Sequence, residues 1–325
     1  MKISSIISQR IYLHYPSYKI VYEWENIISK ELDIPIIKET KLQKYFRRVF
    51  EKCGLQFLYH YFLPQKSLSL RFLMTATTEK LCGFNKNTIP VIIDFWLEKK
   101  DLSNFAMAFK KCPLVLVTNK EVYNFLKDNS CPLKIAHWPL SYPDIYAISE
   151  DSFFEKKYEF CLFGRPNPFF IRLLEEYSKK HPDFEYIISK GTERNRTFYT
   201  NKGTFVSRDT GRESYMNMIK STKISCYTTP GIDESKKETK KFNQVTPRLF
   251  ELLCNGCMVI GHYPKAADTD WYKLSDIIPN VNNYDEFEDV LNRFRSESFP
   301  LMKVVNYMKK HYTSARCEKI GRAHV

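Results

Sequence analysis

Residues 246–261 limit the fold more than any other part of this sequence. Thr246 is a favourable N-cap, and Pro247 suits the first helical position, where its missing N–H would have had no partner. Asn255-Gly256 is a helix stop that tolerates positive φ. The apolar run at 257–260 is typical of a buried strand. A short helix followed at once by a buried strand is a building unit of parallel sheets, so this stretch predicts an α/β fold.

Strand-like and helix-like segments alternate along most of the chain. Residues 140–157, which carry a proline and mixed charges, are typical of a connection between domains. A chain of 325 residues is long enough for two domains with separate cores. We therefore predict an α/β protein of two Rossmann-like domains that face each other across a cleft, residues 1–148 and 149–319. The predicted strands include 3–7, 34–37, 55–62, 69–75, 89–94, 113–118, 133–137, 158–163, 185–189 and 223–227, and the predicted helices include 18–32, 38–52, 102–111, 120–127, 169–180, 213–221, 284–295 and 301–319.

The start of the helix after Thr246 is suited to a phosphate group. A first helical turn offers backbone N–H groups and the positive end of the helix dipole, and Arg248 adds a full positive charge. Glu251 lies one turn further along, where its carboxylate could accept hydrogen bonds from ribose hydroxyls. This combination points to a nucleotide-sugar site.

An ordered set of motifs around this helix resembles a known family. The set is Tyr215, the run at 220–225, the Thr246-Pro247-Arg248-x-Phe250-Glu251 motif and the Asn255-Gly256 stop. In this order they resemble the C-terminal half of bacterial glycosyltransferases of the CgeB-like group, among the glycosyl transferases of group 1, over residues 158–319. That group has the two-domain GT-B fold. The resemblance implies an N-terminal domain that binds the acceptor and a C-terminal domain that binds a nucleoside diphosphate sugar.

The resemblance also implies a pattern of two glutamates in the C-terminal domain. Related retaining enzymes of this fold have two glutamates eight positions apart, the second of which contacts the donor ribose. Glu251 matches the second position, whereas Asn243 occupies the first. Because this pattern is incomplete, both the retaining and the inverting outcome stay open.

Further donor-site candidates follow the first strand of the second domain. Gly164 would permit close approach of the backbone to a diphosphate, and Arg165 would supply charge, although the sequence here is neither a P-loop nor a GxGxxG motif. Lys190 follows the next predicted strand. The candidate donor-binding residues are Gly164, Arg165, Lys190, Tyr227, Asn243, Thr246, Arg248 and Glu251.

Candidates for the acceptor side lie in the first domain. Asp94 ends a predicted strand, where the side chains of a parallel sheet open toward a ligand, and it is our candidate base for deprotonating an acceptor hydroxyl. The alternative is a capping or turn aspartate. His14, Glu23 and His137 are candidate acceptor contacts, and each has a structural alternative on a helix or at a strand end.

The charge distribution bears on partners and location. The net charge is +13, with +7 in residues 1–150 and +6 in the remainder. This even spread argues against a nucleic-acid partner and suits an enzyme of diphosphate substrates. The first residues are too polar for a signal peptide, and no run of about 18 apolar residues exists, so we expect a cytoplasmic protein.

The segment from Lys38 to Lys52 combines basic and apolar residues at helical spacing. Two interpretations stay open. The helix could make a peripheral contact with the inner face of the cell membrane, where a lipid-linked acceptor would be found, or it could be an ordinary surface helix packed on its sheet.

No metal or other cofactor is expected, with a nucleoside diphosphate sugar as donor substrate. Asp268-Thr269-Asp270 imitates the D-x-D metal motif, but it falls in a predicted loop of a fold that does not depend on a bound metal. The nine cysteines have no disulfide-framework spacing.

The leading hypothesis is a metal-independent glycosyltransferase of hexosyltransferase type that serves surface polysaccharide or glycoconjugate synthesis. The alternatives are an epimerase or hydrolase of nucleotide sugars with the same fold, and a basic protein that binds nucleic acid or another anionic polymer. Residues 320–325 do not continue the preceding pattern, and we interpret them as a non-native tail.

Overall fold

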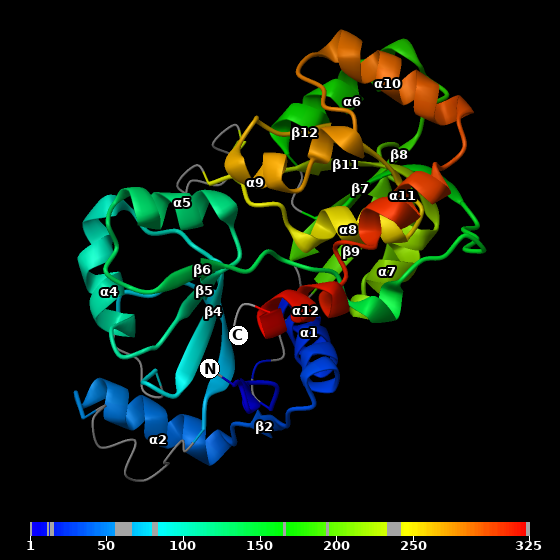
Figure 1. Ribbon diagram of the computed structural model, residues 1–325. Coiled ribbons are helices and arrows are strands. Elements are labelled where there is room, and N and C mark those ends of the chain that lie inside the picture. Colours follow the sequence, from blue (N-terminus) through cyan, green and yellow to red (C-terminus); the bar gives the residue numbers. More distant parts are fainter. Residues whose placement is uncertain are drawn as a thin grey trace. The chain divides into compact units, whose positions relative to one another are not determined.

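The computed structural model describes residues 2–11, 13, 16–55, 67–79, 84–164, 167–192, 195–232 and 242–322 (Figure 1). The chain divides into two compact units. Unit 1 comprises Met1–Asp144, Glu238–Phe242 and Tyr312–Val325, and unit 2 comprises Ile145–Lys237 and Asn243–His311.

Unit 1 is built on a six-stranded sheet in the order β2-β1-β3-β4-β5-β6, and every neighbouring pair is parallel. Parallel strands are buried on both faces, and β4, with the sequence TIPVIID, shows this as an almost continuous buried run. The strands are β1 (Ser5–Ser8), β2 (Ile36–Lys38), β3 (Ser69–Thr75), β4 (Thr88–Asp94), β5 (Val115–Val117) and β6 (Ile135–His137).

The helices of unit 1 alternate with its strands, as the sequence predicts. Asn119 caps one of them by accepting hydrogen bonds from the N–H groups of Glu121 and Val122. A core of aromatic and aliphatic side chains, including Phe95, Phe105 and Phe109, lies between the sheet and the helices at 102–109 and 120–128. The helices are α1 (Pro16–Leu32), α2 (Lys41–Lys52), α4 (Leu102–Phe109), α5 (Lys120–Asp128) and α12 (Thr313–Arg322).

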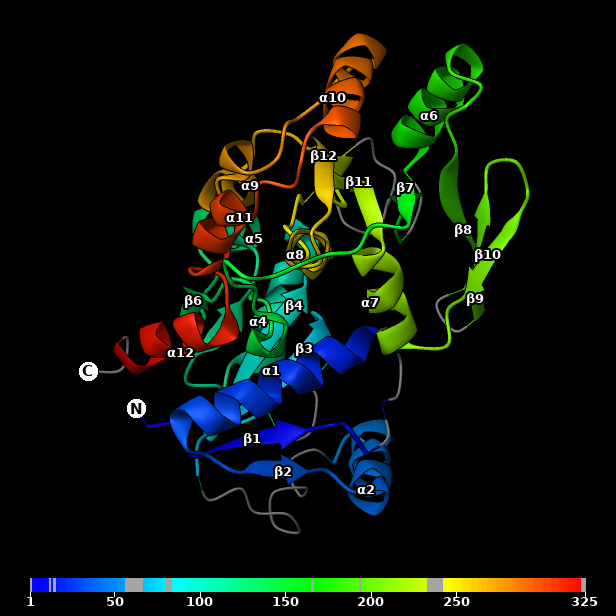
Figure 2. The ribbon, with the colours of Figure 1, turned by 90° about the vertical axis from the view of Figure 1, so that its right-hand side faces the viewer.

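The helix predicted at 301–319 is in fact two helices, α11 (Leu301–Met308) and α12. The break has a tertiary cause. Tyr312 forms a β-bridge with Tyr142, and the N–H of Thr313 donates to the carbonyl of Tyr142, so the chain leaves helical geometry there. Helix α12 runs beside α1 within unit 1 (Figure 2). The final helix therefore belongs with the N-terminal part of the chain, not with the domain at 149–319 in which the sequence placed it.

Unit 2 contains a second six-stranded sheet, in the order β10-β9-β8-β7-β11-β12. The pairs β8-β7, β7-β11 and β11-β12 are parallel. The pairs β9-β8 and β10-β9 are antiparallel. These antiparallel strands extend the sheet beyond β8 (Figure 2). The strands are β7 (Tyr158–Leu162), β8 (Tyr186–Thr192), β9 (Asn195–Thr200), β10 (Phe205–Arg208), β11 (Thr222–Thr228) and β12 (Met258–His262).

The helices of unit 2 pack on this sheet by their apolar sides. Helices α6 and α10 contact each other over the core that contains Leu174, Phe287 and Leu291 (Figure 2). Helix α8 keeps the predicted limits, with Gly256 at φ +73° after its C-cap. The helices are α6 (Pro168–Lys180), α7 (Arg212–Lys220), α8 (Pro247–Cys254), α9 (Ala267–Trp271), α10 (Tyr284–Ser296) and α11.

The expected α/β fold with two parallel-rich sheets is confirmed. One local expectation is wrong, because Asp268-Thr269-Asp270 lies in α9 and not in a loop. Another, the strand at 55–62, lies almost entirely outside the described residues. The cysteines in the described part of the chain are all free, and Cys254 and Cys257 are both buried.

Candidate functional site

The candidate site lies at one edge of the unit 2 sheet. Strands β7, β11 and β12 are adjacent and parallel, so their carboxyl ends meet at the same edge. The chain leaves β7 through Gly164, and it returns to this edge through residues 243–246 before α8 begins. Helices that follow parallel strands start at this edge, which is where α/β folds place their ligands.

A set of buried hydrogen bonds fixes the segment that enters α8. The N–H of Val245 donates to Oδ2 of Asp268 at 2.6 Å, and the N–H of Thr246 donates to the hydroxyl of Tyr227 at 2.9 Å. Asn243 Oδ1 accepts from the hydroxyl of Thr229 at 2.8 Å. Tyr227 and Asn243, predicted as donor-binding residues, thus make contacts that hold the segment in place. Thr246 is the N-cap by its backbone, but its side chain makes no capping hydrogen bond.

Arg248 lies directly against Gly164. Gly164 has φ +81°, and a Cβ atom added to it would lie 1.6 Å from Nη1 and 2.2 Å from Cζ of Arg248. Only glycine permits this approach, because any side chain would occupy the space of the guanidinium group. The sequence predicted both residues for the donor site, and the structure brings them together.

Tyr215 extends this cluster, since two guanidinium groups lie near its ring. Cζ of Arg196 is 5.3 Å and Cζ of Arg248 is 6.0 Å from the ring centroid. Burial raises the pKa of Tyr215 to about 12, so its hydroxyl stays protonated at neutral pH. Within the described ranges, this buried hydroxyl has no hydrogen-bond partner.

Glu251 is buried and paired with a residue that the sequence reasoning did not consider. Its Oε1 accepts from Nη1 of Arg212 at 2.6 Å. Arg212 is the first residue of α7, and Arg196 pairs with Asp209 at 3.6 Å nearby. The cluster thus contains three guanidinium groups and two carboxylates, and the buried carboxylate of Asp268 lies at the same entry to α8. Arg212 lies 39 positions from Glu251, so no local sequence signal could have revealed the pair.

A second helix begins at the same edge. Asn167 caps α6 by accepting from the N–H of Phe169 at 2.8 Å, and Pro168 occupies the first helical position. The amide nitrogen Nδ2 of Asn167 is buried and, among the residues that the structure describes, has no hydrogen-bond partner. Buried donors without partners are rare in proteins, so this amide is a candidate contact for a ligand or a water molecule. An Asn-Pro pair directly after the Gly164 loop was the signal that could have identified Asn167.

Two predicted donor-binding residues remain, Lys190 and Arg165. Lys190 lies within β8, because the strand continues beyond its predicted end, and its ammonium group lies 5.2 Å from the ring centroid of Tyr199. The neighbouring residue Ser189 donates to the carbonyl of Gly164 at 3.3 Å, and the side chain of Lys190 projects from the opposite face of β8. Arg165 lies outside the described residues.

The acceptor-side candidates belong to unit 1. Asp94 and His137 are the last residues of β4 and β6, which lie on either side of β5, so both are at the carboxyl edge of that sheet. Burial lowers the pKa of His137 to about 4. Glu23 is half-buried on α1, and His14 lies outside the described residues.

Glu25, two positions after Glu23 on α1, lies at the same carboxyl edge. It is buried, accepts from the hydroxyl of Ser8 at the end of β1, and pairs with Arg10 at 2.8 Å. Burial raises the pKa of its carboxyl. Among the described side chains, no group of three or more His, Cys, Asp and Glu residues is arranged to hold a metal ion.

No protein-family model and no curated protein matches this sequence. Among solved structures, the chain is similar to the GtfA/B complex, with TM-score 0.51, 11% identity, and coverage of 84% of this chain and 60% of the other. It is likewise similar to the pneumococcal O-GlcNAc transferase GtfA in complex with UDP and GlcNAc, with TM-score 0.51, 10% identity and coverage of 84% and 59%. The chain thus spans about 60% of the length of these two structures. The similarity shows the fold, which is that of GT-B glycosyltransferases.

Proposed function

We propose that this protein is a glycosyltransferase that moves a sugar from a nucleoside diphosphate sugar to a glycan or lipid-linked acceptor. We place it with the CgeB-like group and in the cytoplasm, and assign it to surface polysaccharide or glycoconjugate synthesis with no requirement for a metal. Unit 2 would hold the donor and unit 1 the acceptor. The GT-B fold supports this proposal, since it is the fold of a solved O-GlcNAc transferase complex with UDP and GlcNAc.

The observation that carries the proposal is the contact between Arg248 and Gly164 at the start of α8. A diphosphate needs positive charge and N–H donors that are already in position when the ligand arrives. Arg248 supplies the charge, and its guanidinium group packs against the backbone of the loop at residue 164, which has no side chain to displace it. Asn167 adds a buried amide donor at the start of a second helix.

The same groups would act on the transition state. Breaking the glycosidic bond leaves negative charge on the departing nucleoside diphosphate. Fixed guanidinium groups and helix N-termini stabilise that charge more strongly than they stabilise the bound donor, and this difference lowers the barrier. The guanidinium groups of Arg196, Arg212 and Arg248 suit this role.

Glu251 is proposed to accept hydrogen bonds from the donor ribose. Arg212 donates to Oε1 from the side of α7, and a carboxylate can accept several hydrogen bonds, so it could also accept from the ribose hydroxyls. Arg165 and Lys190 are proposed as further contacts of the diphosphate or the sugar.

In unit 1, Asp94 is proposed to take the proton of the attacking hydroxyl if the reaction inverts the sugar. A base must lie at the open end of the strands to reach a substrate, and Asp94 ends β4. His14, Glu23 and His137 are proposed as acceptor contacts. A lipid-linked acceptor would also require the protein to reach a membrane surface.

The test is the thermal stability of the purified protein with UDP, GDP, ADP, TDP and CMP, each with and without EDTA. A ligand at about 100 times its dissociation constant should add about 2.7 kcal/mol of stability. We expect one diphosphate to stabilise the protein equally with and without EDTA. Arg248→Gln should weaken this nucleotide about tenfold or more, because a charge-assisted contact is worth about 1.5–3 kcal/mol.

Arg293→Gln is the matched control, since Arg293 is an exposed arginine on α10 of the same unit. It should leave nucleotide binding unchanged. Equal loss in both variants, or no response to any nucleotide, would contradict the donor site. Incubation of the effective nucleotide sugar with and without an acceptor then separates transfer from hydrolysis or epimerisation, because only transfer consumes the donor in proportion to the acceptor.

A further inference from the structure

Helix α2 of unit 1 presents its apolar side chains to solvent. None of its residues is buried, and its large apolar side chains are highly exposed. A surface helix of a globular protein normally turns its apolar stripe toward the core. The exposed fractions are 63% for Leu42, 64% for Tyr45, 47% for Phe46 and 39% for Val49.

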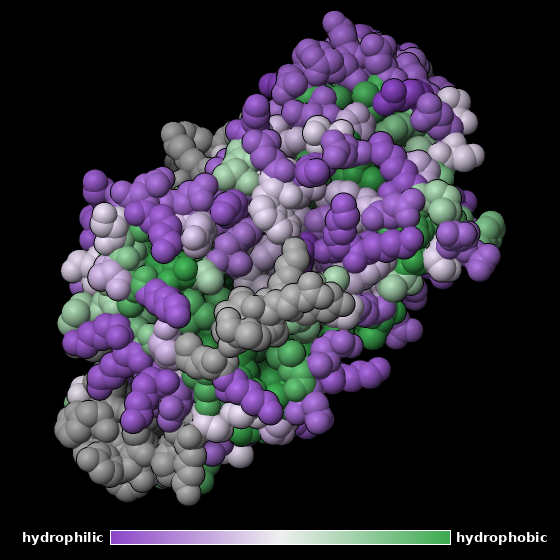
Figure 3. All heavy atoms as spheres, viewed as in Figure 1, coloured by the Kyte–Doolittle hydropathy of each residue, from purple (hydrophilic) through white to green (hydrophobic). Residues whose placement is uncertain are grey.

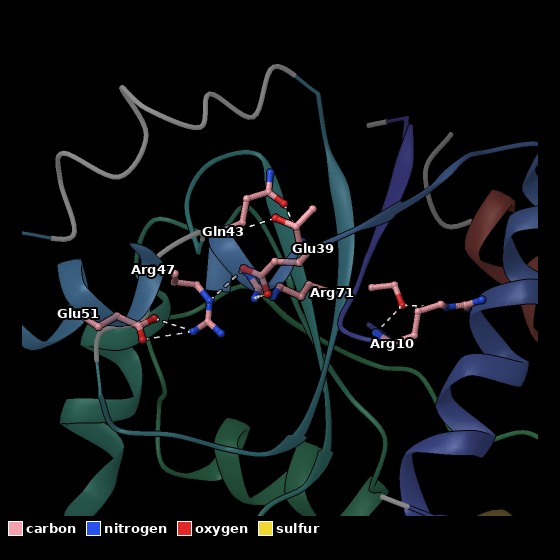
Figure 4. A network of polar contacts seen from close by, with 8 residues as sticks. Arg10, Glu39, Gln43, Arg47, Glu51 and Arg71 are labelled. Carbon is pink, nitrogen blue, oxygen red and sulfur yellow. Dashed lines mark hydrogen bonds and ion pairs between the residues drawn. The ribbon is translucent and has the colours of Figure 1, made fainter. Parts of the chain in front are cut away.

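The opposite side of α2 is held by ion pairs. Arg47, with 12% of its side chain exposed, pairs through Nε with Glu39 at 3.0 Å and through Nη1 with Glu51 at 3.0 Å (Figure 4). Glu39 is buried and also pairs with Arg71 of β3 at 3.2 Å. This network fixes which side of α2 faces the sheet and leaves the apolar side outward.

The apolar side is bordered by positive charge. One residue advances about 100° around a helix, so Lys41, Arg48 and Lys52 lie close together on one flank of the stripe formed by Leu42, Tyr45, Phe46 and Val49. All three basic residues are exposed. Arg47 is roughly 160° from Val49, in agreement with its inward position.

We infer that α2 lies in the interface of an anionic lipid surface. A helix with an exposed apolar stripe, a basic flank and an aromatic residue has the composition of interfacial helices, which insert the stripe at the headgroup boundary while the basic groups contact anionic headgroups. At 12 residues it is about 18 Å long and lies along such a surface. None of the helices in the described ranges has the length and hydropathy to cross a bilayer.

Charge favours lipid over a second copy of this chain as the occupant. Pairing of two α2 helices about a two-fold axis would bring two basic flanks together in a protein of net charge +13. An anionic bilayer instead offers both the negative charge and the apolar depth that this side of α2 requires. The inference concerns unit 1 alone and does not depend on the donor site in unit 2.

The test is flotation of the purified full chain with vesicles of phosphatidylcholine, with or without phosphatidylglycerol. We expect binding to the anionic vesicles that weakens with added salt and is much lower on phosphatidylcholine alone. Replacing Lys41, Arg48 and Lys52 together by Gln should reduce partitioning about 100-fold, at roughly fivefold for each charge. Leu42→Ser with Phe46→Ser should reduce it about tenfold or more.

The matched control is Met302→Ser with Phe205→Ser, which removes one aliphatic and one aromatic side chain of similar exposure from unit 2. It should float like the parent protein. Equal losses in the control and the α2 variants would overturn the inference, as would equal binding to both kinds of vesicle. The inference would also be overturned if the protein did not bind vesicles but associated with itself, and if the α2 substitutions abolished that self-association.

A Tyr45→Trp variant reports insertion directly. Tyr45 is exposed, so a tryptophan there should show a blue shift of its added fluorescence on anionic vesicles. An unshifted spectrum on floated protein would place the contact elsewhere on the molecule. Nucleotide binding, measured by thermal stability, should be the same in all α2 variants, which separates failure of this inference from failure of the proposed function.

Discussion

Helices α2 and α8 both follow a threonine N-cap, yet they use their apolar and basic residues in opposite ways. Helix α8 buries Leu249, Phe250, Leu252 and Leu253 and leaves its arginine at the rim of the sheet. Helix α2 buries nothing and directs Arg47 inward.

The sheet explains the difference. Helix α8 joins β11 to the adjacent parallel strand β12, so a wide apolar surface lies beneath it. Helix α2 follows β2, a three-residue strand at the sheet edge, which offers little apolar area. Amphipathic sequence alone therefore does not decide which side of a helix faces the core. Helix α10 has the usual arrangement of a surface helix. It buries Phe287 and Leu291, and the surface over it is hydrophilic (Figure 3).

Removing one phenylalanine from each helix tests whether α8 is packed by its apolar side and α2 is not. Phe250→Ala in α8 should lower the free energy of unfolding by about 3–5 kcal/mol, because it opens a cavity in a packed core. Phe46→Ala in α2 should change it by less than about 0.5 kcal/mol, since the side chain is already half in water. Urea unfolding of both variants measures the difference. Similar losses would mean that α2 is packed by its apolar side.

The ion pairs beneath α2 can be tested by Glu39→Gln. This change leaves Arg47 and Arg71 facing an uncharged amide in a buried position, and it should cost about 3 kcal/mol in unfolding free energy. Glu51→Gln removes the more exposed partner of the same arginine and should cost less than about 1 kcal/mol. If Glu39→Gln were as mild as Glu51→Gln, the network would not be what orients α2.

Unit 1 should also be sensitive to acid through His137. Burial is the main cause of its low pKa of about 4, and the charges of Lys120 and Arg316 act in the same direction. Because the folded pKa is depressed below the ordinary 6.5, stability from the neutral ring is present above pH 6.5 and is lost as the pH falls toward 4. The loss should reach at most about 3 kcal/mol.

Unfolding free energies measured from neutral pH to about pH 4 test this point. The slope should be reduced in His137→Asn relative to the parent protein. Parallel curves for the two proteins would show that other groups cause the acid sensitivity.

The smallest predicted effect concerns the α8 side of the comparison. Gly164→Ala should weaken nucleotide binding about tenfold, because the new Cβ atom would displace the guanidinium group of Arg248. Gly203→Ala is the matched control, since Gly203 has φ +91° and no atom within 4 Å of an added Cβ. Thermal stability with the preferred nucleotide measures both. Equal binding in the two variants would remove Arg248 from the site.

Much of the fold could be predicted because its signals are local. The limits of α8 follow from Pro247, whose missing N–H needs no partner in the first turn, and from Asn255-Gly256, where a positive φ ends the helix. The strand ending at Asp94 follows from its apolar run and β-branched residues. Gly164 and Arg248 were both predicted for the donor site because each follows a strand or begins a helix, and the structure places them in contact.

The remainder depended on contacts between residues far apart in the chain. The spacing of basic and apolar residues predicted a basic amphipathic helix over residues 38–52, and the structure begins that helix at Lys41, after the Thr40 cap. Only the tertiary structure decided which side of that helix faces outward, because Glu39 and Arg71 lie 32 positions apart and meet through the sheet. The ion pair of Arg212 with Glu251 and the helix break at the Tyr142–Tyr312 bridge likewise join residues that are far apart in the sequence. Local sequence patterns carry no information about such contacts.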